Sequence, residues 1–73
     1  MFKGKVVWFS SQKGFGFVRR DSDGAEFFAH FSQILADGYK KLDVDDVVEF
    51  SVGEGPNGKQ QAEQIQVLQK AVA

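Results

Sequence analysis

The sequence predicts a small all-β protein, and three observations point to this class. Several stretches alternate polar and apolar side chains with the two-residue period of a β-strand. Turn signals rich in glycine, aspartate and asparagine separate these stretches. The chain has 73 residues, enough for one hydrophobic core, and no stretch leaves room for two helices beside the strands. We therefore expect residues 1–73 to form a single domain.

Composition narrows the functional classes. The chain contains no cysteine, so disulfides and cysteine-ligated zinc are excluded. No apolar run has membrane-spanning length and no secretory signal is recognisable, so we expect a cytoplasmic protein without a membrane partner. The net charge is −1, but residues 1–20 carry five basic and no acidic residues. One face can therefore attract a polyanion although the whole chain is slightly acidic.

The first strand is expected from Lys3 to Ser10, with Val6 in the core. Strict alternation would place Trp8 on the same face as Val6, which conflicts with an exposed indole. A β-bulge near Val7 would remove this conflict, and bulges are frequent in small barrels. We therefore expect an irregularity in the middle of this strand.

The second strand, over about Gly14–Arg20, carries the main functional hypothesis. Its large rings, Phe15 and Phe17, share one face with Lys13 and Arg19, while small residues occupy the other face. Rings between two cations make a poor buried face but a good platform for stacking nucleobases. The alternative is that both rings face the core, as most phenylalanines in small domains do. This stretch by itself leaves both interpretations open.

The third strand is expected over Ala25–Phe31. The turn-forming residues 21–24 precede it and make it the hairpin partner of the second strand. Apolar Phe27 and Ala29 alternate with polar and aromatic residues, so the same two-faced pattern appears again. Together the two strands would present five rings on one surface: Phe15, Phe17, Phe28, His30 and Phe31. Burying all five would also bury charged neighbours at high cost, so the sequence favours an exposed ring platform.

The second half of the chain is expected to be structural. We predict a short helical turn over 32–36, an irregular loop over 39–44, a fourth strand around 48–52 and a fifth strand over 60–68. The expected apolar contributors of the fifth strand are Ala62, Ile65 and Val67. We expect residues 69–73 to form a frayed tail.

Neither a metal site nor an active site is indicated. Asp43, Asp45 and Asp46 lack the spacing of a calcium loop, so we interpret them as a solvated acidic edge. His30 has no cysteine partner, and no serine is marked as a nucleophile. We therefore expect no enzymatic activity, no metal and no cofactor.

Two motifs give the chain a family resemblance. Lys13–Val18 resembles the first ribonucleoprotein motif of the cold-shock domain, and Phe27–Phe31 resembles the second. Gly4–Phe9, Phe31–Ile34 and Asp37–Leu42 match further landmarks in the family's order. The first motif also resembles the RNA recognition motif, but that αβ fold needs two helices. The chain is thus similar to the small bacterial cold-shock proteins from about residue 4 to residue 65.

The resemblance implies a five-stranded antiparallel OB-fold barrel that binds single-stranded RNA and DNA with low sequence specificity. It further implies an RNA chaperone and a regulator of transcription or translation in the cold-shock or stress response. The nucleic-acid-binding residues it implies are Trp8, Lys13, Phe15, Phe17, Phe28, His30, Phe31 and Tyr39, with Lys59 as a cation of the late loop. We expect a monomer and keep a dimer as the alternative.

The chain departs from the family pattern at three places. Val7 and Ser10 stand where lysine and asparagine are usual, and the loop Gly55–Gln61 lacks the common proline before glutamine.

The alternative function is a protein-interaction module, because OB barrels also bind peptides and an aromatic face can be a protein interface.

Overall fold

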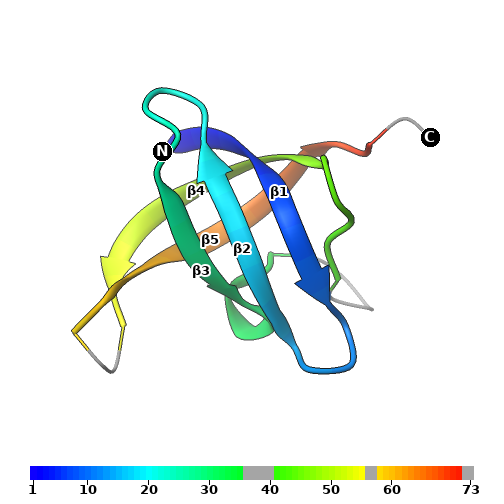
Figure 1. The fold of residues 1–73 in the computed structure, drawn as a ribbon, viewed down its shortest axis with the longest axis horizontal. Helices are drawn as coiled ribbons and strands as arrows, with labels where there is room; N and C mark the ends of the chain where they lie inside the picture. The colour runs from blue at the N-terminus through cyan, green and yellow to red at the C-terminus, as the bar shows by residue number, and fades with distance from the viewer. Residues whose placement is uncertain (36–40, 56–57, 72–73) are drawn as a thin grey trace.

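The computed structural model describes residues 1–35, 41–55 and 58–71, and these ranges form a closed barrel of five strands. The strands are β1 (Phe2–Ser10), β2 (Phe15–Arg20), β3 (Glu26–His30), β4 (Val47–Glu54) and β5 (Gln60–Gln69). Their order around the barrel is β1-β2-β3-β5-β4. In Figure 1, β1, β2 and β3 form the layer nearest the viewer, and β4 and β5 cross behind it. The predicted all-β barrel is confirmed.

One part of the fold prediction is wrong: the barrel is not purely antiparallel. β3 and β5 pair in parallel, whereas the other four neighbouring pairs are antiparallel. The reason is parity, because strands that alternate direction around a closed ring must be even in number. A ring of five therefore contains at least one parallel pair. It falls between β3 and β5, which no hairpin joins.

The alternation of inward and outward side chains is interrupted in the middle of β1. Its register with β2 shifts between Val6 and Trp8, so Val6 is buried with 1% exposed while Trp8 is 39% exposed. This confirms the bulge expected near Val7. The two strands approach closely here, because a Cβ added to Gly16 would collide with the Trp8 carbonyl oxygen and with Phe9. β2 therefore needs a glycine at a position where a strand normally carries a side chain.

The inward faces of the strands form one core. Its buried members are Val6, Val18, Phe27, Ala29, Ile34, Leu42, Val48, Phe50, Ala62 and Ile65. Ala62 and Ile65 both point inward although they are three positions apart, since Gln64 takes a positive φ of 52° and the register with β4 is irregular there. Val67 packs against the core and is partly buried. The three predicted apolar contributors of the last strand are thus confirmed.

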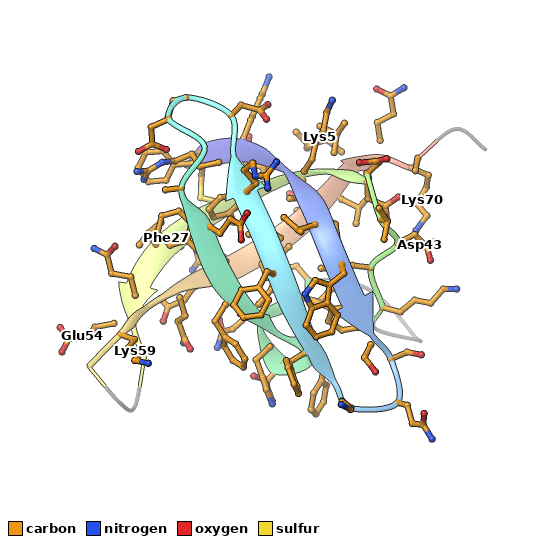
Figure 2. All side chains as sticks on the ribbon, in the orientation of Figure 1. Lys5, Phe27, Asp43, Glu54, Lys59 and Lys70 are labelled. Atoms are coloured by element: carbon orange, nitrogen blue, oxygen red, sulfur yellow. The ribbon has the colours of Figure 1, made fainter. Side chains whose placement is uncertain are left out.

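The prediction of a solvated acidic edge is wrong for Asp46, whose side chain is fully buried. Its carboxylate accepts hydrogen bonds from the Asp43 and Ala71 backbone N–H groups and from Lys70 Nζ, at 3.0, 2.7 and 2.9 Å. Burial alone raises the pKa of the Asp46 carboxyl, but these hydrogen bonds outweigh it and hold the pKa below its ordinary value. Lys70 also donates to Asp43 Oδ2 at 3.0 Å, and Figure 2 shows the two side chains together.

The same contacts bear on the tail expected over 69–73. Gln69 is the last residue of β5, and Lys70 and Ala71 are hydrogen-bonded to Asp46. The described part of the tail is therefore tied to the barrel as far as Ala71, because a buried carboxylate needs donors and the chain end supplies two of them.

Helix in the described ranges is one 3₁₀ turn, η1 (Phe31–Gln33). It starts one residue earlier than predicted, because His30 caps it: the His30 side chain accepts from the Ser32 backbone N–H. Ala36, the expected end of the turn, lies outside the described residues. None of the described helix is long and apolar enough to cross a membrane.

Candidate nucleic-acid interface

Six rings gather on the outward face of the β1–β2–β3 layer, and we call them the ring cluster: Trp8, Phe15, Phe17, Phe28, His30 and Phe31. Strand register brings them together. Trp8 lies opposite Phe17, which lies opposite Phe28 on β3. Phe15 lies opposite His30 in the next row. Directly paired residues point to the same side of a sheet, so two short strands and the bulged end of β1 supply five of the rings, and Phe31 at the start of η1 supplies the sixth.

The rings contact each other along their edges and faces. Trp8 meets Phe15 and Phe17 at centroid distances of 5.7 Å each. Phe28 is stacked on Phe15 at 5.5 Å and 28°, and it meets Phe17 edge-on at 6.0 Å. These separations lie in the range of favourable aromatic pairs, so the rings support one another without being buried in the core.

Exposure separates the ring cluster from the core. Trp8 and Phe31 are 39% and 45% exposed, and the other four rings are half-buried. Their neighbours along β2 and β3 are buried, with Val18 and Ala29 at 0% and Phe27 at 5%. The alternative that Phe15 and Phe17 face the core is therefore wrong. The face pattern read from the sequence is the one the barrel has.

His30 is held in one orientation by its own turn. Its Nδ1 accepts the Ser32 backbone N–H at 3.2 Å and lies 2.8 Å from Ser32 Oγ. Because Nδ1 must offer a lone pair to that N–H, the neutral imidazole carries its proton on Nε2. The ring stacks on Phe28 at 6.2 Å and tilts against Phe31 at 4.7 Å. The contact with Ser32 is thus a helix cap, and the ring itself belongs to the stacking surface.

Among the described residues, one cation on the face of the rings is paired with an acid. Lys13 is exposed in the β1–β2 turn, whose shape depends on Ser10: Ser10 Oγ accepts the Lys13 backbone N–H at 3.2 Å. Arg19 shares the face of the rings, but its guanidinium donates to Glu26 on β3, at 2.6 Å for the shorter contact. The positive charge of Arg19 is therefore largely compensated next to the ring cluster.

Arg20 lies on another side of the barrel. It donates to both carboxylate oxygens of Asp23 and covers the rings of Phe2 and Phe27, 4.6 and 5.0 Å from their centroids. The hydrogen bond from Arg20 is the main cause that lowers the pKa of the Asp23 carboxyl to about 2. The basic excess of residues 1–20 is thus partly neutralised by two acids that follow it closely in the sequence, Asp23 and Glu26.

Two predicted site residues lie apart from the ring cluster or outside the described chain. Lys59 is exposed at the tip of the β4–β5 hairpin, beside Glu54 (Figure 2), and its carbonyl oxygen accepts the Gly55 backbone N–H at 2.7 Å. Tyr39 falls in the range 36–40, outside the described residues.

A shallow hollow of about 320 Å³ borders the ring cluster, and three of its five lining residues were not among the predicted site residues. It is lined by Phe28, His30, Ser32, Gln33 and Gln61. Gln61 reaches this place because it pairs with Phe28 across the parallel β3–β5 seam. No local pattern marks such a pairing, so the polar border of the rings was invisible from the sequence. Within the described ranges, no group of three histidine, aspartate or glutamate side chains could hold a metal ion.

Comparison with known proteins agrees with this architecture. Residues 2–68 match the family described as the 'Cold-shock' DNA-binding domain. The chain is 48% identical over 60 residues to a cold shock-like protein CspC of Bacillus cereus, covering 82% of this chain and 91% of that one. It is 44% identical over 68 residues to a cold shock-like protein CspA of Bordetella pertussis, covering 93% and 100%.

Longer proteins contain similar units. Cold shock protein 1 of Arabidopsis thaliana is 46% identical over 59 residues, which are 81% of this chain and 20% of that protein. Among solved structures, Drosophila Unr CSD456 superposes with a TM-score of 0.72 at 33% identity, over 92% of this chain and 26% of that one. The barrel therefore occurs both as nearly a whole protein and as one unit of larger proteins.

Proposed function

Since the chain belongs to the family of cold-shock DNA-binding domains, we propose that it binds single-stranded RNA and DNA by stacking bases on the ring cluster. The family is one of nucleic-acid-binding, non-enzymatic domains, so the proposal concerns what is bound and how. The observation that carries it is a group of six adjacent rings on one face, two of them exposed and four half-buried, above strands whose inward residues are buried.

Stacking would supply most of the affinity. A base that stacks on an aromatic side chain is worth about 1–3 kcal/mol, and every base has a face to offer. Stacking therefore discriminates little between sequences. The proposed nucleic-acid-binding residues are Trp8, Lys13, Phe15, Phe17, Phe28, His30, Phe31, Tyr39 and Lys59.

Phosphate contacts would contribute less. Lys13 and Lys59 are exposed, whereas Arg19 donates to Glu26. Val7, the residue before Trp8, supplies no charge beside the indole. Each phosphate neutralised on a single strand adds about 0.7 to the slope of log affinity against log salt, so two lysines give a slope of only about −1.4. We therefore propose a binder with weak salt dependence.

The same geometry would exclude duplexes, because paired and stacked bases cannot turn their faces to a protein surface. Weak binding to exposed bases would draw RNA away from secondary structure without ATP, which is the action of an RNA chaperone. We propose that the protein works in this way as a monomer in the cytoplasm. By changing RNA structure, it would influence transcription or translation in the cold-shock or stress response.

The test is fluorescence anisotropy of a dye-labelled oligo-thymidine, with a labelled duplex of equal length as control. The proposal predicts saturable binding of the single strand that weakens little between low and high salt, and no comparable binding of the duplex. A hairpin beacon should open on addition of protein without ATP. Equal affinity for duplex and single strand would refute the stacking mechanism. No binding of either by the folded protein would favour the protein-interaction module, for which the contiguous exposed rings are also suited.

A further inference from the structure

The bulge that turns Trp8 outward is fixed by a segment far away in the sequence. The Val6 backbone N–H donates to the Asp46 carbonyl oxygen at 3.1 Å, and the Val6 carbonyl oxygen accepts the Asp45 N–H at 2.9 Å. Both backbone polar groups of Val6 are therefore taken by residues 45–46, at the point where β1 loses its regular register with β2. The bulge lies between Val6 and Trp8, so residues 45–46 act on the position of Trp8 through the Val6 backbone.

The segment itself has a conformation that needs support. Asp45 has a positive φ of 71°, a left-handed conformation that is uncommon for residues other than glycine. Such a conformation persists where surrounding contacts impose it. Asp45 itself donates to Val6, and the next residue is anchored by residues 70–71, since Lys70 Nζ and the Ala71 backbone N–H both donate to the buried Asp46 carboxylate. A third donor to the Asp46 carboxylate is the backbone N–H of Asp43, which belongs to the same turn.

We propose that the Asp46 carboxylate, held by Lys70 and Ala71, is a positioning residue for base stacking on Trp8. We call Asp46, Lys70 and Ala71 the tail clamp. The clamp fixes residues 45–46, these fix the Val6 backbone and its bulge, and the bulge holds the indole 5.7 Å from the rings of Phe15 and Phe17. This inference rests on the proposed function, because it gives the chain end a part in single-strand binding.

Coupling of this kind is reciprocal. If the tail clamp favours the Trp8 position that stacks on a base, then a base stacked on Trp8 must favour the closed clamp by the same factor. The clamp contains a backbone reporter, the Ala71 N–H, whose hydrogen bond to Asp46 Oδ1 is 2.7 Å long. Its hydrogen exchange follows opening of the clamp and can be measured in the unaltered protein.

The first experiment compares Lys70→Met with Lys41→Met. Both lysines are about half exposed and approach Asp43, but only Lys70 reaches Asp46. Binding of oligo-thymidine is measured for each variant in the native background and in a Trp8→Ala background. Lys70→Met should weaken binding roughly 2- to 30-fold in the native background, the usual range for residues that couple to a distant site. Lys41→Met should not, and Lys70→Met should have no further effect once Trp8 is absent.

The second experiment measures Ala71 amide exchange with and without saturating oligo-thymidine, in the native protein and in Trp8→Ala. Slower exchange of the Ala71 amide on binding, seen only when Trp8 is present, supports the inference without any change in the residues of the clamp.

In the first experiment, an equal loss of affinity from Lys70→Met in both backgrounds would show a general structural role and overturn the inference. Unchanged affinity of Lys70→Met would overturn it as well. Absence of binding by the native protein would instead refute the proposed function, and this inference with it.

Discussion

Phe27 and Phe28 are adjacent in β3 and differ only in the side of the sheet to which they point, which makes them a matched pair. Phe27 is 5% exposed and packs in the core against Phe50, with ring centroids 5.9 Å apart. Phe28 is half-buried in the ring cluster, stacked on Phe15. The same substitution by alanine should therefore damage the fold at one position and binding at the next.

The expected changes in unfolding free energy and in affinity differ between the two variants. Truncating a buried phenylalanine costs about 3–5 kcal/mol of unfolding free energy. A domain of this length has only about 4–11 kcal/mol in total, so Phe27→Ala should leave a marginally stable protein. Phe28→Ala removes half-buried aromatic pairs, each worth about 0.5–1.5 kcal/mol in stability. It also removes one stacking surface worth about 1–3 kcal/mol in binding, which weakens single-strand affinity roughly 5- to 150-fold.

The assay is urea unfolding of both variants, followed by anisotropy with labelled oligo-thymidine under conditions where each is folded. Phe27→Ala should lose several kcal/mol of stability and keep near-native affinity for the fraction that is folded. Phe28→Ala should show the reverse. If Phe28→Ala unfolds while Phe27→Ala is stable, or if Phe28→Ala binds normally, the assignment of the ring cluster as the binding surface is refuted.

Three further predictions concern the charges of two lysines, the close approach of β1 to β2, and the loss of stability at low pH. Lys13→Met combined with Lys59→Met should reduce the salt slope of single-strand binding by about 1.4, and an unchanged slope would remove both lysines from the interface. Gly16→Ala should cost about 3 kcal/mol in thermal unfolding because its Cβ collides with backbone, whereas Gly24→Ala, with φ +72° but open space, should cost about 1 kcal/mol. Equal costs would contradict the close approach of β1 and β2. The pKa of Asp46 is lower in the folded state than in the unfolded chain, so its stabilisation is complete above about pH 4 and is lost as the pH falls through the folded-state pKa. Asp46→Asn should accordingly lose less stability than the native protein between pH 7 and pH 3 in urea unfolding, and an equal loss would argue against a low Asp46 pKa.

The face of the barrel that carries the rings was predictable because it depends on local alternation. Phe15, Phe17 and Phe28 share a face with polar residues, and this pattern needs only the two-residue period of a strand and one turn between β2 and β3. The bulge in β1 was predictable for a similar reason. Val6 and Trp8 require different environments, and only an irregular register satisfies both.

Features that depend on closure of the barrel were not predictable from local pattern. The parallel β3–β5 pair follows from the parity of a closed ring, which no single strand reveals, and it brings Gln61 beside Phe28. Burial of Asp46 depends on Lys70 and Ala71, 24 and 25 residues further along the chain. An aspartate in an acidic run looks solvated until the donors that bury it are known.

Stacking of bases on the ring cluster can be followed by the intrinsic emission of Trp8, the chain's one tryptophan. Emission is followed while the protein is titrated with unlabelled oligo-thymidine, and separately with the matching duplex. We expect strong, saturable quenching by the single strand and little change with the duplex, because only unpaired bases can stack on the indole. No change with either nucleic acid, while the protein remains folded, would contradict a ring cluster that binds single strands.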